Sequence, residues 1–257
     1  GSFASVNATG GVAVTSNLTM TGNIVIPDGG TIGQAAGPLI TFDDTLNYLE
    51  ISGCNVGIGT ATPSQALDLI GSLELEDTTT STTGVIFKGA NRFIHNYHDP
   101  DGDGVGGPIP VGRNTFVGEL AGNFTMGSTA TQTYHASYNN AIGYSSFFSN
   151  TTGYNNNAMG YSSLYYNTTG YNNNAVGTSS LFKNTTGYNN NAMGYYSLFS
   201  NTTGYGNNAV GASPLYYNTT GYNNNAVGTS SLYKNTTGYN NTAIGTYSLY
   251  SNTTGYY

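Results

Sequence analysis

The chain of 257 residues is poor in charge, since 5 Lys or Arg and 12 Asp or Glu make up only 7% of it and leave a net charge of −7. An acidic chain without basic clusters argues against a nucleic-acid partner, and no apolar run approaches the roughly 20 residues of a membrane-spanning helix. The one cysteine, Cys54, excludes an internal disulfide, and we expect it to be a small buried residue.

Residues 1–53 form the first expected segment, a shaft of short β-strands. Short β-type runs such as Leu39–Phe42 and Tyr48–Ile51 are separated by turn signals, among them Gly10-Gly11 and Asp28-Gly29-Gly30. Such short, sparse strands cannot bury one another in a monomer. We therefore expect several chains to intertwine here about a common axis.

Residues 54–112 form a second β segment with an acidic loop. Asp99, Asp101 and Asp103, followed by Gly104, match the opening of a calcium-binding loop, but its twelfth position is Pro110 where a bidentate Glu belongs. Calcium is one hypothesis for this loop, and a solvated acidic turn is the other. His95 and His98 with Asp99 are a weaker metal hypothesis, and no other cofactor is expected.

Residues 113–257 contain a 17-residue sequence repeat that occurs seven times from Tyr138 onward. Such a fixed period predicts stacked coils that pack on their neighbours. Glycine, asparagine and paired threonines disfavour helix. We expect two short strands per coil, at Asn-Ala-Val-Gly and Ser-Leu-Tyr, with glycine supplying positive φ at the corners. Residues 114–127 resemble a degenerate first coil, and an insert at 128–137 is expected to be a loop standing off the shaft.

Three apolar columns run through the coils, beginning at Ala141, Ile142 and Phe147. We expect the Ile/Met/Val and Leu columns to fill the core of each coil. The small Ala column, on the opposite strand face, would then admit a second chain closely, which predicts a homotrimer. Two forms stay open: three two-sheet rolls about an axis, or a single chain coiled as a triangular helix.

Asparagine and tyrosine columns predict ladders of identical side chains, one of which begins at Asn140. One tyrosine column is a candidate binding face for carbohydrate or another surface, with packing between coils as the alternative reading. Its candidate residues are Tyr154, Tyr171, Tyr188, Tyr205, Tyr222 and Tyr239. The Asn-Thr-Thr triplets fit the N-glycosylation pattern, but turn formation is the favoured reading.

A family resemblance begins at residue 55. The stretch NVGIGTATPSQALDL, Asn55–Leu69, resembles a signature of phage and bacterial tail-fibre-domain proteins, and Gly71–Leu75 matches the strand that follows it. The 17-residue repeats are similar to that family's tandem arrays and to the head repeats of trimeric autotransporter adhesins. The resemblance covers about residues 55–257 and implies a homotrimeric fibre, exported or carried on a virion, with no catalytic residues to carry over.

The sequence as a whole predicts an all-β, fibrous homotrimer that is not an enzyme. Its first expected function is structural: an extracellular, cell-surface or virion-tail fibre that attaches to a receptor or polymer surface. A glycan- or polymer-binding solenoid module is the alternative, with ice binding less favoured, and a non-catalytic part of a tailspike is a third. The repeats contain no acid and no histidine, so they offer no catalytic carboxylate pair or nucleophile–base set.

Overall fold

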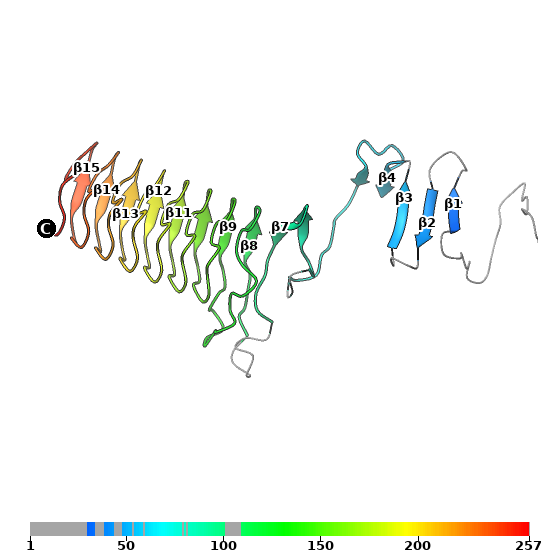
Figure 1. The fold of residues 1–257 in the computed structure, drawn as a ribbon, viewed down its shortest axis with the longest axis horizontal. Coiled ribbons are helices and arrows are strands. Elements are labelled where there is room, and N and C mark those ends of the chain that lie inside the picture. Colours follow the sequence, from blue (N-terminus) through cyan, green and yellow to red (C-terminus); the bar gives the residue numbers. More distant parts are fainter. Residues whose placement is uncertain are drawn as a thin grey trace, which may run out of the picture. The chain divides into compact units, whose positions relative to one another are not determined.

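The computed structural model describes residues 30–33, 39–43, 48–52, 54–58, 60–78, 80, 82–100 and 109–256, in which every regular element is a β-strand (Figure 1). The chain divides into two compact units, Gly1–Glu74 and Leu75–Tyr257. The all-β prediction is therefore confirmed for the described residues, and none of them forms a helix that could cross a membrane.

The described residues of the first unit form five short strands. β1 (Gly30–Gly33), β2 (Leu39–Asp43) and β3 (Tyr48–Ser52) form an antiparallel sheet in that order. β4 (Val56–Ile58) and β5 (Leu67–Leu69) pair in parallel within the segment that carries the family resemblance. Cys54 is exposed, which corrects the expectation of a buried cysteine. The intertwining of several chains in residues 1–53 stays a prediction.

The second unit is a ten-stranded sheet in which neighbours in sequence are neighbours in space. It starts with an antiparallel hairpin of β6 (Ile86–Lys88) and β7 (Asn91–His95), followed by β8 (Thr115–Val117). From β8 onward all strands are parallel. The repeats supply β9 (Asn140–Ile142), β10 (Asn157–Met159), β11 (Asn174–Val176), β12 (Asn191–Met193), β13 (Asn208–Val210), β14 (Asn225–Val227) and β15 (Thr242–Ile244).

Identical repeat positions pair directly: Ala158 lies opposite Ala175, and Ala175 opposite Ala192, at every 17-residue step from β9 to β15. The predicted solenoid with 17-residue coils is therefore confirmed. Figure 1 shows these strands side by side along the array, each followed by a loop that leads to the next. Parallel neighbours in such a sheet lie about 4.8 Å apart, which sets the rise per coil.

Each coil contains one strand, so the second strand predicted at Ser-Leu-Tyr is wrong. The Leu of this segment has a φ of 47–50°, and Phe147 at the same position has 57°, in the left-handed region that a strand excludes. The residue two before it has a φ of 52–57°. The amides at these positions bond in opposite directions: Ser162 N donates to Tyr144 O of the preceding coil, and Leu164 N to Ser180 O of the next. The turn thus joins both neighbouring coils without a strand.

Two glycine columns are required for different reasons. Gly177, directly after β11, has a φ of 132°, and a Cβ there would lie 2.6 Å from Gly194 O of the next coil. Gly170 lies in ordinary φ space, but its Cβ would collide with Asn167 Oδ1 and Gly187 O. Positive φ was predicted for the glycine of the Asn-Thr-Thr-Gly corner and is wrong there; it occurs in the glycine column after each strand, and the corner position is glycine for lack of room.

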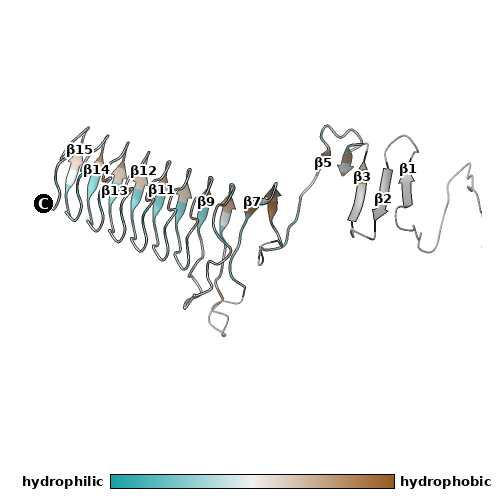
Figure 2. Cartoon of the chain, viewed as in Figure 1, coloured by the Kyte–Doolittle hydropathy of each residue, from teal (hydrophilic) through white to brown (hydrophobic). Residues whose placement is uncertain are grey.

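The prediction that the Leu column fills the core is confirmed, but the Ala and Ile/Met/Val columns are placed the other way round from the sequence expectation. The Ala column, from Ala141 to Ala226, is fully buried, together with Phe147 and the Leu column as far as Leu232. The Ile/Met/Val column points outward on the other strand face. Figure 2 shows strands of the array changing from hydrophilic at their start to hydrophobic at their end. The Ala argument for a second chain is therefore wrong, because a coil of 17 residues leaves room only for a small side chain beside Leu and buried Asn.

Two asparagine ladders run inside the array, one from Asn139 to Asn241 and one from Asn150 to Asn235, and their members are buried. Asn184 Nδ2 donates to Asn167 Oδ1 (2.7 Å) and to Gly187 O (3.0 Å), and its own Oδ1 accepts from Asn201 Nδ2 (2.8 Å). The predicted ladder in the Asn140 column forms as well, on the outside, where Asn157 Nδ2 donates to Asn174 Oδ1 at 2.8 Å. Every coil is therefore bonded to the next through side chains as well as backbone.

The insert at 128–137 folds back at both ends, so it is not wholly the free loop that was expected. Ala130 and Ala136 are buried, and Ala136 N donates to Thr152 O at 3.1 Å. The ring of Tyr134 packs edge-on against Tyr154 at 4.8 Å, which covers the start of the tyrosine column. The insert therefore helps to cap the array, as the atypical first coil of a solenoid must.

Candidate binding faces of the repeat array

The candidate tyrosine column is a continuous stack of rings. From Tyr154 to Tyr256 successive centroids lie 4.8–5.0 Å apart with interplanar angles of 0–7°. Because each ring face covers the next, only ring edges and hydroxyl groups face outward. Burial, and then the neighbouring Tyr171, raises the pKa of Tyr154. The column therefore serves packing between coils, and any binding would use hydroxyl groups and not ring faces.

A second aromatic column, from Phe148 to Tyr250, is stacked with centroids 5.0–5.4 Å apart. The residues that follow it in the chain lie beside it on the surface and lean toward the next coil. Lys183 Nζ lies 5.5 Å from the Phe199 ring centroid, and Lys234 Nζ lies 5.4 Å from that of Tyr250. Both ammonium groups are thus held against an aromatic ring by cation–π attraction.

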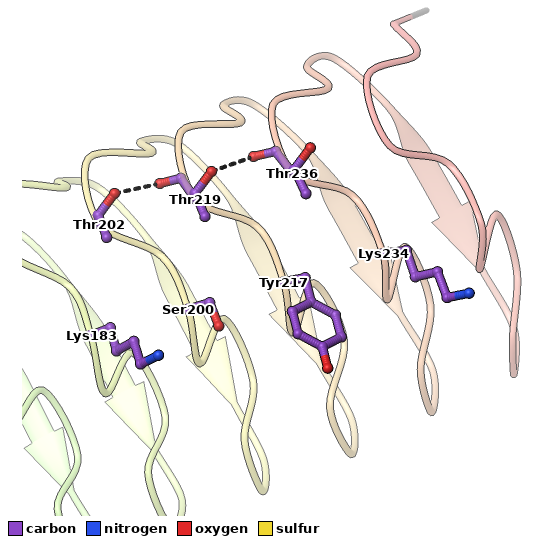
Figure 3. A pocket seen from close by; sticks show the side chains of 7 residues that line it. All are labelled: Lys183, Ser200, Thr202, Tyr217, Thr219, Lys234 and Thr236. Carbon is purple, nitrogen blue, oxygen red and sulfur yellow. Dashed lines mark hydrogen bonds between the residues drawn. The ribbon is translucent and has the colours of Figure 1, made fainter.

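A groove of 590 Å³ lies between the two lysines on the outside of the array. Figure 3 shows Lys183, Ser200, Tyr217 and Lys234 along one wall and Thr202, Thr219 and Thr236 along the other. Thr202 Oγ1 donates to Thr219 O, and Thr219 Oγ1 to Thr236 O, both at 3.1 Å. The threonine hydroxyls are therefore fixed by the coil and can still accept hydrogen bonds from the groove.

The groove was missed from the sequence, although a signal for it exists there. Lys183 and Lys234 are 51 residues apart, which is three coils. The equivalent position in successive coils is occupied by Tyr166, Lys183 and Ser200, and then by Tyr217, Lys234 and Ser251. This outward position therefore repeats every three coils, while the core repeats every coil. A sequence period of 51 residues, in addition to the period of 17, places both lysines at the same position of the coil, three coils apart.

The outward Ile/Met/Val column is a second surface feature of the sheet. Ile142 is 42% exposed, and Met159 and Met193 are each 39% exposed. Between residues 138 and 257 the only charged residues are Lys183 and Lys234, which are not on this face. A continuous row of large apolar side chains with no charged residue among them is typical of an interaction surface.

The acidic loop is only partly described. Asp101 and Asp103 of the calcium hypothesis lie outside the described residues, and only Asp99 of the three lies within them. No cluster of metal-ligating side chains occurs in the part of the chain that the structure describes. The calcium hypothesis at Asp99, Asp101 and Asp103 stays a prediction.

His95 is a buried residue of the cap and is not arranged as a metal ligand. Its Nε2 donates to Ala121 O (2.9 Å), and its Nδ1 accepts from Tyr97 N (3.3 Å), so both ring nitrogens are engaged. The ring packs on Phe116 and Phe124. Burial lowers the pKa of His95 to about 4, opposed by the hydrogen bond to Ala121 O and assisted by the charge of Arg92.

The Asn-Thr-Thr triplets place their asparagines in the second buried ladder. Asn150, Asn167 and the members as far as Asn235 have no exposed surface. A transferase could not reach these amides in the folded array. The turn-forming interpretation is therefore favoured by the structure, with a ladder role that the sequence did not reveal.

Comparison with known proteins gives no relative: no family model matches the chain, and neither a curated protein nor a solved structure matches it significantly.

Proposed function

We propose that this chain is a structural module of an attachment fibre, extracellular, on a cell surface or in a virion tail, that works as a homotrimer and is not an enzyme. The observation that carries the proposal is the outward Ile/Met/Val column, which runs over the full length of the parallel sheet. Its Ile and Met side chains are exposed and its Val side chains are half-buried, so none of them lies in the core of its own coil. They are available to contact another chain.

A second copy of the same array is the partner that fits this face best. Its apolar file has the same rise of about 4.8 Å per coil, so two files can interdigitate over all coils. A partner without that period could match only a few positions. The sheet face carries no charge, so copies do not repel each other there. The copy number of three comes from the resemblance to tail-fibre-domain proteins and adhesin heads.

Exposed apolar residues in residues 58–75 support the same proposal independently. Ile58, Leu67, Ile70 and Leu73 are each more than half exposed in a single chain. They lie in and just after the stretch that resembles the tail-fibre signature. Contact with further chains would remove this surface from water, at a gain of about 25 cal/mol per Å² of apolar area.

The experiment that tests the proposal is a mass measurement by sedimentation equilibrium. The parent protein is expected to have three times the mass of one chain at micromolar concentration. A double variant, Met159→Asn with Met193→Asn, is expected to dissociate into single chains, because polar side chains break the apolar file. Thr169→Asn with Thr186→Asn, at exposed positions away from the sheet, is the matched control and should stay trimeric. A parent protein that is a stable monomer would overturn the proposal.

A further inference from the structure

The groove between Lys183 and Lys234 has a chemistry of its own, and we infer that it binds an anionic, hydroxyl-rich polysaccharide lying along the coil axis. This inference deepens the attachment role proposed above and rests on it, since it names the class of polymer that the fibre would hold. It uses a surface different from the Ile/Met/Val column, so the two proposals can fail separately.

Charge is the first argument. Lys183 and Lys234 are the only charged residues in the repeats, and all 12 acids of the chain precede them. No carboxylate within the array can therefore pair with either ammonium group. The groove is a positive strip on an otherwise neutral surface, and it attracts anions.

Position is the second argument. The two lysines occupy the same station three coils apart, which is about 14 Å along the axis at 4.8 Å per coil. Each ammonium group is held over an aromatic ring of the next coil, Phe199 or Tyr250. Two fixed cations on one line suit a linear polymer whose acidic groups recur along its length.

The lining between the lysines is the third argument. Ser200 and Tyr217 offer hydroxyl groups that can donate or accept, and the row of Thr202, Thr219 and Thr236 offers acceptors on the opposite wall. This set matches the many hydroxyls of a sugar chain. A single-stranded nucleic acid would need a row of exposed ring faces for successive bases, but the neighbouring aromatic column presents its faces to itself, and Tyr217 is the only aromatic ring in the lining of the groove.

The three-coil period is the fourth argument. From Leu164 onward the Leu and inner Asn positions of the core are the same in every coil, so packing does not require a lysine at one coil in three. Tyr166 and Tyr217 recur with the same spacing, and each packs edge-on against the next coil's ring, at 5.2 and 5.3 Å. The recurring Tyr-Lys-Ser set is thus a property of the outer surface alone.

The test measures binding of two acidic polysaccharides to the intact protein by isothermal titration calorimetry. Polygalacturonate carries carboxylates and dextran sulfate carries sulfates, so the polymer that binds with higher affinity identifies which anionic group the groove prefers. Neutral dextran is the uncharged reference. At least one acidic polymer is expected to bind, with affinity that falls as salt is raised. Lys183→Gln with Lys234→Gln is expected to weaken it about tenfold or more, in keeping with the loss of charge-assisted hydrogen bonds.

The matched control is Lys88→Gln with Arg113→Gln, which removes the same charge from exposed positions outside the groove and should leave affinity within about twofold. The inference is overturned if neither acidic polymer binds, if neutral dextran binds as well as they do, or if the control weakens binding as much as the groove variant. Tighter binding of single-stranded DNA than of either polysaccharide would also overturn it. Sedimentation of the groove variant keeps the two proposals apart: it is expected to remain trimeric, as the groove is not the contact face.

Discussion

At the residue scale, His95 shows how the cap of the array depends on pH. Its folded pKa of about 4 lies below the ordinary value of about 6.5 because burial disfavours the charged ring. As pH falls below 6.5 the unfolded chain binds a proton that the folded chain excludes until about pH 4. The stability present above pH 6.5 is therefore lost as pH is lowered through this window.

We expect the free energy of unfolding to fall by about 3 kcal/mol between pH 7 and pH 4 on account of His95 alone, at 1.36 kcal/mol per pKa unit. Urea unfolding followed by tyrosine fluorescence at several pH values measures it. His95→Gln keeps a donor for Ala121 O but does not titrate, so the difference between parent and variant isolates this residue. Parallel pH profiles for the two proteins would contradict the prediction.

Gly177 tests the close approach of neighbouring coils. Gly177→Ala would place a Cβ 2.6 Å from Gly194 O, in a backbone conformation with a φ of 132°. Gly245→Ala, at a φ of 116° in the last coil, meets no atom within 4 Å and is the matched control. We expect Gly177→Ala to destabilise the array by about 1–3 kcal/mol more than the control, as overpacking does. Equal melting temperatures for the two variants would contradict the close approach.

At the element scale, the inner asparagine ladders set the stability of the solenoid. Asn184→Ala removes three side-chain hydrogen bonds and leaves the buried Asn167 Oδ1 and one N–H of Asn201 Nδ2 without those partners, while Gly187 O still accepts from Asn173 Nδ2. The expected loss is about 2–4 kcal/mol, since each buried unpaired group costs about 1–3 kcal/mol. Asn191→Ala, in the half-buried outer ladder, makes the same chemical change and should lose about 1 kcal/mol, because water can replace its partner. Chemical denaturation of both variants measures the difference.

The sequence predicted the period, the strand at Asn-Ala-Val and the outer Asn ladder, because these follow from repetition alone. Alternation along a strand also placed Ala and the Ile/Met/Val column on opposite faces correctly. Which face points inward depends on how tightly the coil closes, and hydrophobicity misled there. The Ser-Leu-Tyr turn was missed because a left-handed φ at Leu has no signature in the sequence.

The candidate site was predictable only in part. The tyrosine column could be read from its spacing, but the direction of the rings, which hides their faces, follows from stacking in three dimensions. Predicting the groove would have required the three-coil spacing of Lys183 and Lys234. It would also have required the knowledge that this position of the coil faces outward beside the row of threonines. Neither lysine carries a motif on its own.

At the scale of the whole molecule, the proposed fibre depends on the array behaving as one stack of coils. Each coil is joined to the next by backbone bonds, two inner Asn ladders and two aromatic stacks, so the apolar file and the groove keep a constant spacing. Stability in such a stack comes from contacts between neighbours. Contact faces for other chains and for a polymer are useful only if that spacing is regular.

The most direct test is a pair of distances between nitroxide labels, measured by double electron–electron resonance. The labels are attached to cysteines introduced in a Cys54→Ser background, and labelled chains are diluted among unlabelled ones. Labels at exposed Thr169 and Thr237 are four coils apart and should lie about 19 Å from each other, and labels at Thr169 and Thr254, five coils apart, about 24 Å. The account predicts that the distance grows by about 4.8 Å for each added 17 residues. Distances that do not grow with the number of coils would contradict it.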